Sequence, residues 1–241
     1  MKKKKVETIE NRWDILYKDY PEAYDEFANV EKLGSTIKSI HKMFNLKDKV
    51  ILDVGSGTGL STFDLAKYAK FVIGIEPEKA MRRIALTNAK RRKIKNVRFL
   101  KGMAEKIPLE DNSIDAAVAV TSCPYKKAKI KQFIKEAIRV VKKGGFIATV
   151  DVAPKWYGGE LAPIILGEKR VTKEDTEGVV DKVLSDLYFK HKDVFIISKY
   201  GSLKKILATY GFIFGRKAID YIKKHKKTSI KEKFRIHYKK V

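Results

Sequence analysis

The chain has 241 residues, of which 44% are hydrophobic and 34% are charged, and this balance suits one domain with a full hydrophobic core. Its single cysteine, Cys123, excludes internal disulfide bonds and a metal site built from cysteines. No apolar run approaches the roughly 20 residues of a membrane span, and Val6–Glu10 is not the core of a signal peptide. We therefore expect a cytoplasmic protein.

The formal net charge is +24 at pH 7, which leaves two interpretations open. A charge of this size is typical of proteins that bind nucleic acid. It is also typical of a lysine-rich, thermophile-like surface with many ion-pairing groups. We favour the second interpretation, because Lys and Arg occur along the whole chain among Asp and Glu and are not confined to one arm.

Helical patterns dominate the first 48 residues. Residues 1–5 are expected to fray. We predict a first helix at Glu7–Asp19 and a third at Lys32–Phe44. A second helix should begin at Pro21, because proline suits the first turn of a helix. The turn at 45–49 leads into the first strand.

A buried strand followed by a glycine turn comes next. Val50–Val54 is apolar except for Asp53, and Gly-x-Gly-x-Gly follows at 55–59. Glycines let a ligand approach the backbone, and the amides of the turn and of the next helix face a ligand at the strand end. The dinucleotide fingerprint needs its third glycine where Leu60 stands, and the Gly-Lys-Ser/Thr of a P-loop is absent. Asp53 would repel a phosphate but suits a cationic ligand.

The second apolar run, Phe71–Ile75, ends in Glu76. A carboxylate at the end of the second strand, about 20 residues past the glycine turn, is the usual acceptor for ribose hydroxyls in nucleotide-binding α/β sheets. The combination of a strand, a glycine turn, a helix, a second strand and an acid is much more specific than the glycine turn alone.

Alternating helices and strands continue to residue 151. We predict helices at Leu60–Ala69 and Glu78–Lys93, strands at Val97–Leu100 and Ile114–Thr121, a helix from Ile130 to Val141 that Gly144-Gly145 ends, and a fifth strand at Phe146–Val150.

The pattern breaks after residue 151. Residues 152–200 contain Pro154, Trp156 and an amphipathic helix at Thr172–Leu187, and this segment is too short for a core of its own. We expect an insertion on the same sheet. A helix from Leu203 that Gly211 stops and two closing strands, at Phe212–Phe214 and Phe234–Tyr238, complete the chain.

These motifs resemble a known family. Its signatures are matched in order by Leu52–Gly59, Gly74–Pro77, Gly102–Leu109, Asn112–Asp115 and Glu136–Gly145. The chain is similar to class I S-adenosylmethionine-dependent methyltransferases, closest to the type 11 subgroup that includes ubiquinone and menaquinone biosynthesis methyltransferases and many small-molecule enzymes. The resemblance is good over about residues 48–151 and weak outside them.

The resemblance implies a Rossmann-like α/β fold with a seven-stranded, mostly parallel sheet, an antiparallel last strand and helices on both faces. It implies one methyltransferase domain over 1–241. Its parts are an N-terminal helical lid (1–48), the cofactor-binding core (49–151), a substrate-side insertion after strand five (152–200) and a closing helix with strands (201–241).

The resemblance also implies S-adenosyl-L-methionine as cofactor and no metal. Asp53 and the glycine turn would hold its methionine end, Glu76 its ribose, and residues near Met81 and Glu105 its adenine, although Met81 and Glu105 also fit ordinary core and surface positions. The cofactor-binding residues implied are Tyr24, Asp53, Gly55, Ser56, Gly57, Gly59, Glu76, Pro77, Met81, Ala104, Glu105 and Thr121.

Methyl transfer from a sulfonium mainly requires alignment and a dry site, and a base is needed only when the acceptor must lose a proton. The family has no universal catalytic residue, so the sequence assigns none. Ser122-Cys123-Pro124-Tyr125 partly matches the motif of amino-group methyltransferases that act on nucleic-acid bases. Cys123 is better explained as a small buried thiol than as a nucleophile.

Three functions stay open. We favour a small-molecule acceptor, held by residues of the lid, the strand ends and the insertion, although the aromatics among them equally suit simple packing. The second function is an RNA or protein-lysine methyltransferase that uses the basic surface, and the third is a non-catalytic cofactor-binding regulator. The substrate residues we predict are Tyr20, Ser122, Tyr125, Trp156 and Tyr157.

Overall fold

The computed structural model describes residues 8–30, 33–167 and 178–241. Its contacts divide the chain into two compact units. The core unit comprises Leu33–Ala153, Glu177–Val194 and Lys233–Val241, and the helical unit comprises Met1–Lys32, Pro154–Thr176 and Phe195–Glu232.

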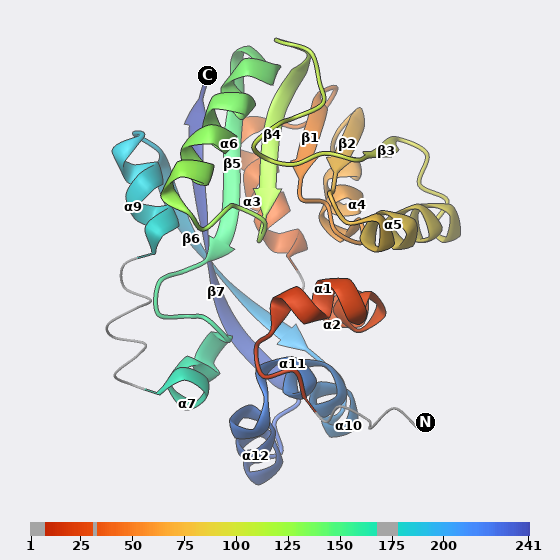
Figure 1. Ribbon diagram of the computed structural model, residues 1–241, viewed down its shortest axis with the longest axis vertical. Coiled ribbons are helices and arrows are strands. Elements are labelled where there is room, and N and C mark those ends of the chain that lie inside the picture. Colours follow the sequence, from red (N-terminus) through yellow and green to blue (C-terminus); the bar gives the residue numbers. More distant parts are fainter. Residues whose placement is uncertain (1–7, 31–32, 168–177) are drawn as a thin grey trace. The chain divides into compact units, whose positions relative to one another are not determined.

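The described residues form a seven-stranded sheet in the order β3-β2-β1-β4-β5-β7-β6 (Figure 1). Strands β1 to β5 pair in parallel, and β7 is antiparallel to β5. The predicted Rossmann-like sheet with an antiparallel last strand is therefore confirmed. The strands are β1 (Val50–Val54), β2 (Phe71–Ile75), β3 (Val97–Leu100), β4 (Ile114–Val120), β5 (Val141–Val152), β6 (Lys190–Lys199) and β7 (Ser229–Lys240).

The register brings the chemically important strand ends to one edge. Asp53 of β1 lies beside Gly74 of β2 and Val118 of β4. Parallel strands have their carboxyl ends at the same edge of a sheet, and ligands of open α/β sheets bind there. The turn after β1, Glu76 after β2 and Thr121 after β4 therefore share this edge.

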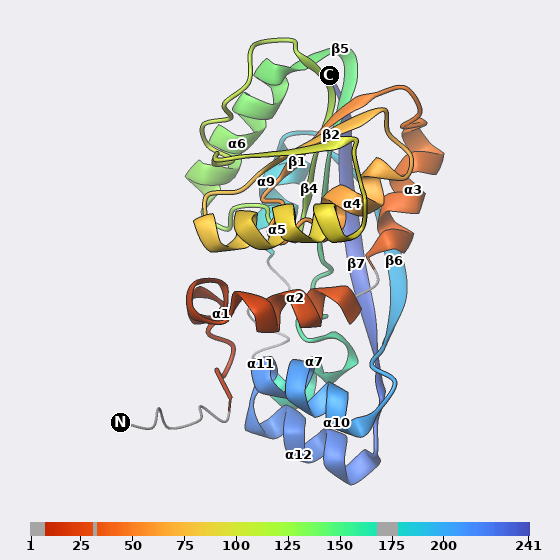
Figure 2. The same ribbon diagram turned by 90° about the vertical axis from the view of Figure 1, so that its right-hand side faces the viewer.

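Helices cover both faces of the sheet in the core unit. Helices α6 and α9 pack together over one face, where Phe133, Ile147 and Leu184 belong to one buried cluster. Helix α3 lies on the other face, and Phe44 stacks on Phe146 with ring centroids 4.1 Å apart (Figure 2). The helices of this unit are α3 (Gly34–Phe44), α4 (Leu60–Ala66), α5 (Lys79–Arg91), α6 (Lys127–Val140) and α9 (Val179–Asp186).

The helical unit has a buried cluster of its own. Leu16 and Phe27 from the N-terminal segment, Leu161 from the insertion, and Tyr210 and Ile222 from the C-terminal segment all belong to it. Its helices within the described residues are α1 (Trp13–Asp19), α2 (Pro21–Val30), η1 (Gly159–Leu161), α7 (Ala162–Leu166), α10 (Leu203–Ile206), the π-helical turn η3 (Leu207–Gly211), α11 (Phe212–Phe214) and α12 (Arg216–His225).

The predicted strand at Phe212–Phe214 is wrong, because these residues form helix α11. Gly211 does not stop the preceding helix, since its φ is −60°, and the break comes at Gly215 with φ +90°. A short apolar run cannot be told from a buried helix by periodicity alone. The remaining strand is β6 (Lys190–Lys199), which lies wholly within the segment 152–200 that was predicted as an insertion.

Gly144 and Gly145 do not end helix α6 as predicted. The helix ends at Val140, and the glycines lie inside β5, opposite a register shift between Ile114 and Ala116 of β4. A Cβ on Gly145 would lie 2.5 Å from the carbonyl oxygen of Asp115. The pair therefore accommodates an irregularity in the strand.

Several predicted helices are shorter than expected. Helix α1 begins at Trp13 and not at Glu7, because Glu10 and Asn11 have positive φ and the Asn11 N–H donates to the Ile213 carbonyl. The first residue predicted for α3 and the first six predicted for α9 lie outside the described residues, as do residues 1–7. Within the described residues α3 begins at Gly34 and α9 at Val179.

Candidate functional site

The glycine turn has a backbone that other residues rarely adopt. Gly55, Gly57 and Gly59 have φ values of +70°, +53° and +92°. The N–H of Gly55 donates to the Ile75 carbonyl over 2.8 Å, which ties the turn to the end of β2. A Cβ on Gly59 would lie 2.7 Å from the ring of Phe63. The conformation therefore favours glycine at all three positions, and at Gly59 the available space requires it as well.

Asp53 is fully buried beneath this turn. Its Oδ2 accepts hydrogen bonds from the hydroxyls of Ser61, over 2.7 Å, and Thr62, over 2.6 Å. Its Oδ1 has no hydrogen-bond partner among the described residues. Burial raises the pKa of Asp53 to about 6, although the two hydroxyls favour the charged form. A buried carboxylate with an unused oxygen is suited to a cationic hydrogen-bond donor.

The sequence analysis did not predict Ser61 and Thr62 as residues of the site. They occupy the first turn of α4, which begins at Leu60. Their signal is only that hydroxyl residues near the start of a helix lie close to the preceding strand, and this signal is too common to be specific.

Glu76 binds the backbone of the turn from the end of β2. Its Oε2 accepts from the Gly57 N–H over 3.0 Å, and its Oε1 accepts from the Glu78 N–H over 2.9 Å. Each oxygen keeps a second lone pair for a ligand hydroxyl. Burial raises the pKa of Glu76, while these hydrogen bonds favour its charged form. Arg82 donates to the carbonyls of Glu76 and Pro77 and so fixes this corner.

The residues predicted at the adenine differ in exposure. Pro77 is exposed, while Met81 is only 3% exposed and packs in the core. Ala104 packs against the core cluster, and Glu105 pairs with Lys129 over 2.7 Å. Their contact with adenine stays a prediction.

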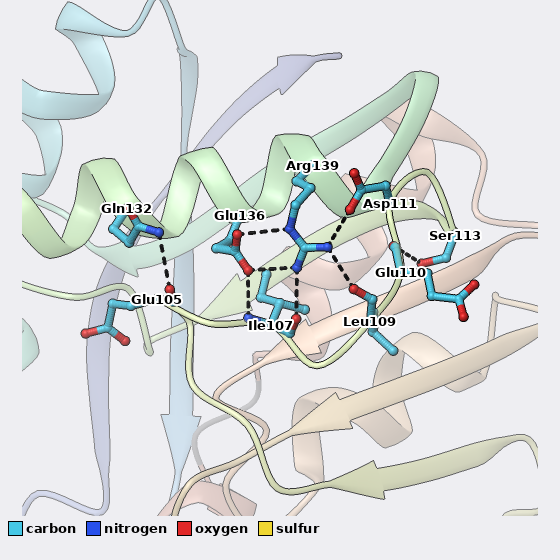
Figure 3. Close-up of polar contacts among 9 residues, drawn as sticks. All are labelled: Glu105, Ile107, Leu109, Glu110, Asp111, Ser113, Gln132, Glu136 and Arg139. Carbon is cyan, nitrogen blue, oxygen red and sulfur yellow. Dashed lines mark hydrogen bonds and ion pairs between the residues drawn. The ribbon is translucent and has the colours of Figure 1, made fainter.

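Arg139 holds the loop that carries Glu105 (Figure 3). It donates to the carbonyls of Ile107 and Leu109, each over 2.9 Å, and pairs with Glu136 and Asp111. Glu136 in turn accepts from the Ile107 N–H over 3.0 Å. The segment between β3 and β4 is therefore fastened to α6 by one guanidinium. The sequence motif contained Glu136 and Arg139 but did not indicate this role.

The end of β4 contacts the glycine turn directly. Thr121 has φ +52°, which is unusual for a β-branched residue. The Ser122 hydroxyl donates to the Val54 carbonyl, and a Cβ on Gly55 would lie 2.5 Å from the Cβ of Ser122. The structure therefore brings together Asp53, the turn, Glu76, Thr121 and Ser122.

The residues after Ser122 lie in contrasting environments. Cys123 is 2% exposed, and burial raises the pKa of its thiol well above the ordinary value. This environment suits the small buried thiol that the sequence favours and opposes a nucleophile. Tyr125 is 75% exposed.

The other predicted aromatic residues belong to the helical unit. Tyr24 packs edge-on against Tyr17, with ring centroids 5.1 Å apart, and Trp156 packs edge-on against Phe195. The Tyr157 hydroxyl accepts from Trp13 Nε1 over 2.6 Å. Tyr20 packs edge-on against Phe212. Their roles toward cofactor or substrate stay predictions.

Within the described ranges, no group of three or more His, Cys, Asp or Glu residues could hold a metal ion. Among the same residues, no helix is long and apolar enough to cross a membrane.

Comparison with known proteins connects this site to a family. Residues 52–149 match the sequence model of a family described as "Methyltransferase domain". This range contains Asp53, the glycine turn and Glu76. Residues 52–149 therefore form a methyltransferase domain of the type 11 family of class I S-adenosylmethionine-dependent enzymes. The sequence-based identification of family, fold and cofactor is thus confirmed.

The methyltransferase domain is similar to several known proteins. It is 30% identical over 128 residues to methyltransferase YcgJ of Bacillus subtilis, which covers 52% of this chain and 48% of that protein. It is 32% identical over 122 residues to demethylmenaquinone methyltransferase of Lactococcus lactis, which covers 48% and 47%. The chain spans about half the length of these curated relatives.

Solved structures share the fold of the methyltransferase domain over more of the chain. The crystal structure of YcgJ has a TM-score of 0.59 at 17% identity and covers 86% of this chain and 99% of that one. The crystal structure of the [4+2]-cyclase SpnF has a TM-score of 0.53 at 18% identity and covers 87% and 82%. Because a cyclase shares it, the fold alone does not decide the reaction.

Proposed function

We propose that this protein transfers a methyl group from S-adenosyl-L-methionine to a small-molecule acceptor. The observation that carries the proposal is the arrangement of Asp53, the glycine turn and Glu76. Three features fit a cationic amino acid joined to a ribose. They are a buried carboxylate oxygen without a partner among the described residues, a turn with three glycines at positive φ, and a second carboxylate with free lone pairs. No phosphate is needed to explain them.

The residues of this chain have separate tasks in the proposed reaction. Asp53 would accept hydrogen bonds from the ammonium group of the cofactor, and Glu76 from its ribose hydroxyls. When bound, the cofactor supplies an electrophilic methyl group on its sulfonium. The glycine turn and Ser122 would hold the sulfonium end of the cofactor in place. A displacement reaction requires this alignment.

Two observations support a small-molecule acceptor. Demethylmenaquinone methyltransferase, one of the similar proteins, acts by its name on a small molecule. Four of the predicted substrate residues are aromatic, namely Tyr20, Tyr125, Trp156 and Tyr157. Aromatic side chains suit an apolar or planar acceptor.

The proposal is tested with tritium in the methyl group of S-adenosylmethionine. The full chain is incubated with an ultrafiltered metabolite extract, with total RNA and with a protein extract, and the labelled fraction is analysed by mass spectrometry. We expect label in the metabolite fraction. Label only in RNA or protein would establish the alternative that the basic surface suggests. Cofactor binding without label in any fraction would indicate a regulator.

A further inference from the structure

A second group of buried polar residues lies in the core unit and has no part in the cofactor site described above. Asp151 stands near the carboxyl end of β5 and is 9% exposed, and His237 of β7 is 2% exposed. In the antiparallel register Thr149 faces His237, and Asp151 faces Arg235. Since side chains two residues apart point to the same face of a sheet, all four share one face.

Some polar atoms of this group have hydrogen-bond partners, and others have none. Arg235 binds Asp193 over 2.7 Å and Asp181 over 3.1 Å, and Asp181 Oδ1 lies 2.7 Å from His237 Nε2. In contrast, Thr149 Oγ1, Asp151 Oδ2 and His237 Nδ1 are buried with no hydrogen-bond partner among the described residues. Buried polar atoms are nearly always paired, so three unpaired ones in neighbouring side chains point to a bound molecule or a moving proton.

Contacts connect Asp151 to the glycine turn. The N–H of Thr121 donates to the carbonyl of Val150, over 2.6 Å, one residue before Asp151. The charge of Asp151 reaches Cys123, where it adds to the rise in the thiol's pKa. Ser122, which stands between Thr121 and Cys123 in the chain, packs against Gly55 of the glycine turn. Asp151 therefore lies at the same strand edge as the turn that would hold the sulfonium.

The electrostatic surroundings of Asp151 suit proton exchange near neutral pH. Burial raises its pKa to about 6, Thr149 and His237 favour its charged form, and Asp181 of α9 opposes it. Among the described residues, Arg235 of β7 and Cys123 after β4 are further titratable groups that face it. A base works best when its pKa lies close to the working pH.

We propose that Asp151 is the general base that removes a proton from the methyl acceptor, and that His237 is a positioning residue beside it. This inference rests on the proposed function. The X–H bond of the acceptor breaks, its proton passes to the Asp151 carboxylate, and the electron pair of X forms the bond to the methyl carbon. The electron pair of the broken carbon–sulfur bond stays on sulfur. The proton then leaves Asp151 for solvent.

The proposal restricts the acceptor to one chemical class. A thiolate or a neutral amine attacks a sulfonium without losing a proton first, whereas a hydroxyl or an acidic carbon must be deprotonated. A buried base at the strand edge of the proposed cofactor site is useful only for the second group. The acceptor is therefore a hydroxyl compound or a compound with an acidic carbon, and the product is an O-methyl or C-methyl compound.

The first test combines Asp151→Asn with a matched variant, Asp115→Asn. Asp115 is a partly buried carboxylate at the start of β4, far along the strand from the carboxyl edge, where it accepts from the Val50 N–H. With tritiated cofactor and the ultrafiltered metabolite extract, we expect Asp151→Asn to lower the rate about 100-fold or more with unchanged cofactor affinity. Asp115→Asn should keep most of the rate. An N-methyl or S-methyl product, or a near-normal rate for Asp151→Asn, would overturn the proposal.

The pH dependence gives a second test. Asp151 is active when charged, so the wild-type rate should fall as the pH drops through about 6. The His237→Gln variant should move this acidic limb while leaving cofactor affinity unchanged, which a merely structural role would not do. Infrared titration without any cofactor should show buried carboxylic acids that titrate near this pH, one of which Asp151→Asn removes. An unshifted limb or an unchanged titration contradicts the proposal.

The two proposals fail in different ways. If calorimetry shows no binding of S-adenosylmethionine to the wild-type chain, the proposed function is wrong. If the cofactor binds and a metabolite is labelled, but Asp151→Asn is active, only the general base is wrong.

Discussion

At the scale of single residues, the proposed cofactor site contains two carboxylates, Asp53 and Glu76, placed where water is excluded. Burying an ionised carboxylate costs several kcal/mol unless hydrogen bonds compensate. Asp53 has two hydroxyl donors and Glu76 has two backbone donors, and each keeps capacity for further hydrogen bonds. Such incomplete compensation is typical of a binding site and costs stability in the free protein.

Glu76→Gln should weaken binding of S-adenosylmethionine by about 1–3 kcal/mol, because an amide cannot accept two ribose hydroxyls while it also accepts the N–H groups of Gly57 and Glu78. Titration calorimetry measures this change. Glu78→Gln is the control, since its side chain is exposed beside the same corner. Equal affinity in wild type and Glu76→Gln would falsify the assignment of Glu76 to the ribose.

Gly59→Ala should lower the free energy of unfolding by about 1–3 kcal/mol through backbone strain and should distort the cofactor turn. Gly144→Ala is the matched control. It introduces the same residue at φ +83° but with no atom within 4 Å, whereas a Cβ on Gly59 meets Phe63 at 2.7 Å. Chemical denaturation should therefore show a larger loss for Gly59→Ala. Similar losses would mean that the turn relaxes around the new methyl group.

At the scale of elements, the cofactor half of the chain was predictable because every signal agreed. Apolar runs, glycine turns and helical periodicity all indicated the same order from Val50 to Leu100. Where signals were short or ambiguous the prediction failed, as for the helix at Phe212–Phe214 and the strand glycines Gly144-Gly145. The first depends on packing in the helical unit, and the second on strand register, and neither is encoded locally.

The candidate site shows the same division. Asp53, the glycine turn and Glu76 follow one another within 24 positions and are visible in the sequence. Asp151 and His237 are far apart in the chain and become neighbours only because β5 and β7 pair in one register. No local sequence pattern indicates such a pair, so a base of this kind can be identified only from a structure.

Arg139→Gln tests the fastening of the loop between β3 and β4. The change removes two hydrogen bonds to backbone carbonyls and the ion pairs with Glu136 and Asp111, and we expect a loss of about 1–3 kcal/mol in the free energy of unfolding. Hydrogen exchange should speed up most at residues 105–113. Lys135→Gln, an exposed change on the same helix, should leave the exchange of the loop unaltered. A uniform effect over the whole chain would argue against local fastening.

At the scale of the whole molecule, charge is less evenly distributed than the sequence interpretation assumed. Between Glu78 and Glu105 the chain has ten Lys or Arg residues and no Asp or Glu. This stretch includes α5 and β3, so one part of the core unit is strongly basic. Ion pairs such as Arg139 with Glu136 neutralise charge elsewhere in the unit. The basic stretch contains no acidic residue of its own.

A net charge of +24 should therefore destabilise the folded chain at low salt. Raising ionic strength from about 0.01 M to about 0.15 M shortens the Debye length from about 30 Å to about 8 Å. If screening stabilises the fold by about 1 kcal/mol, the melting temperature should rise by about 2–4 °C. Differential scanning fluorimetry in sodium chloride and in potassium chloride should give the same rise. Sulfate salts are unsuitable because they also strengthen apolar burial. A constant or falling melting temperature would mean that ion pairs contribute more than repulsion, and that the basic surface is compensated as thermophile-like networks are.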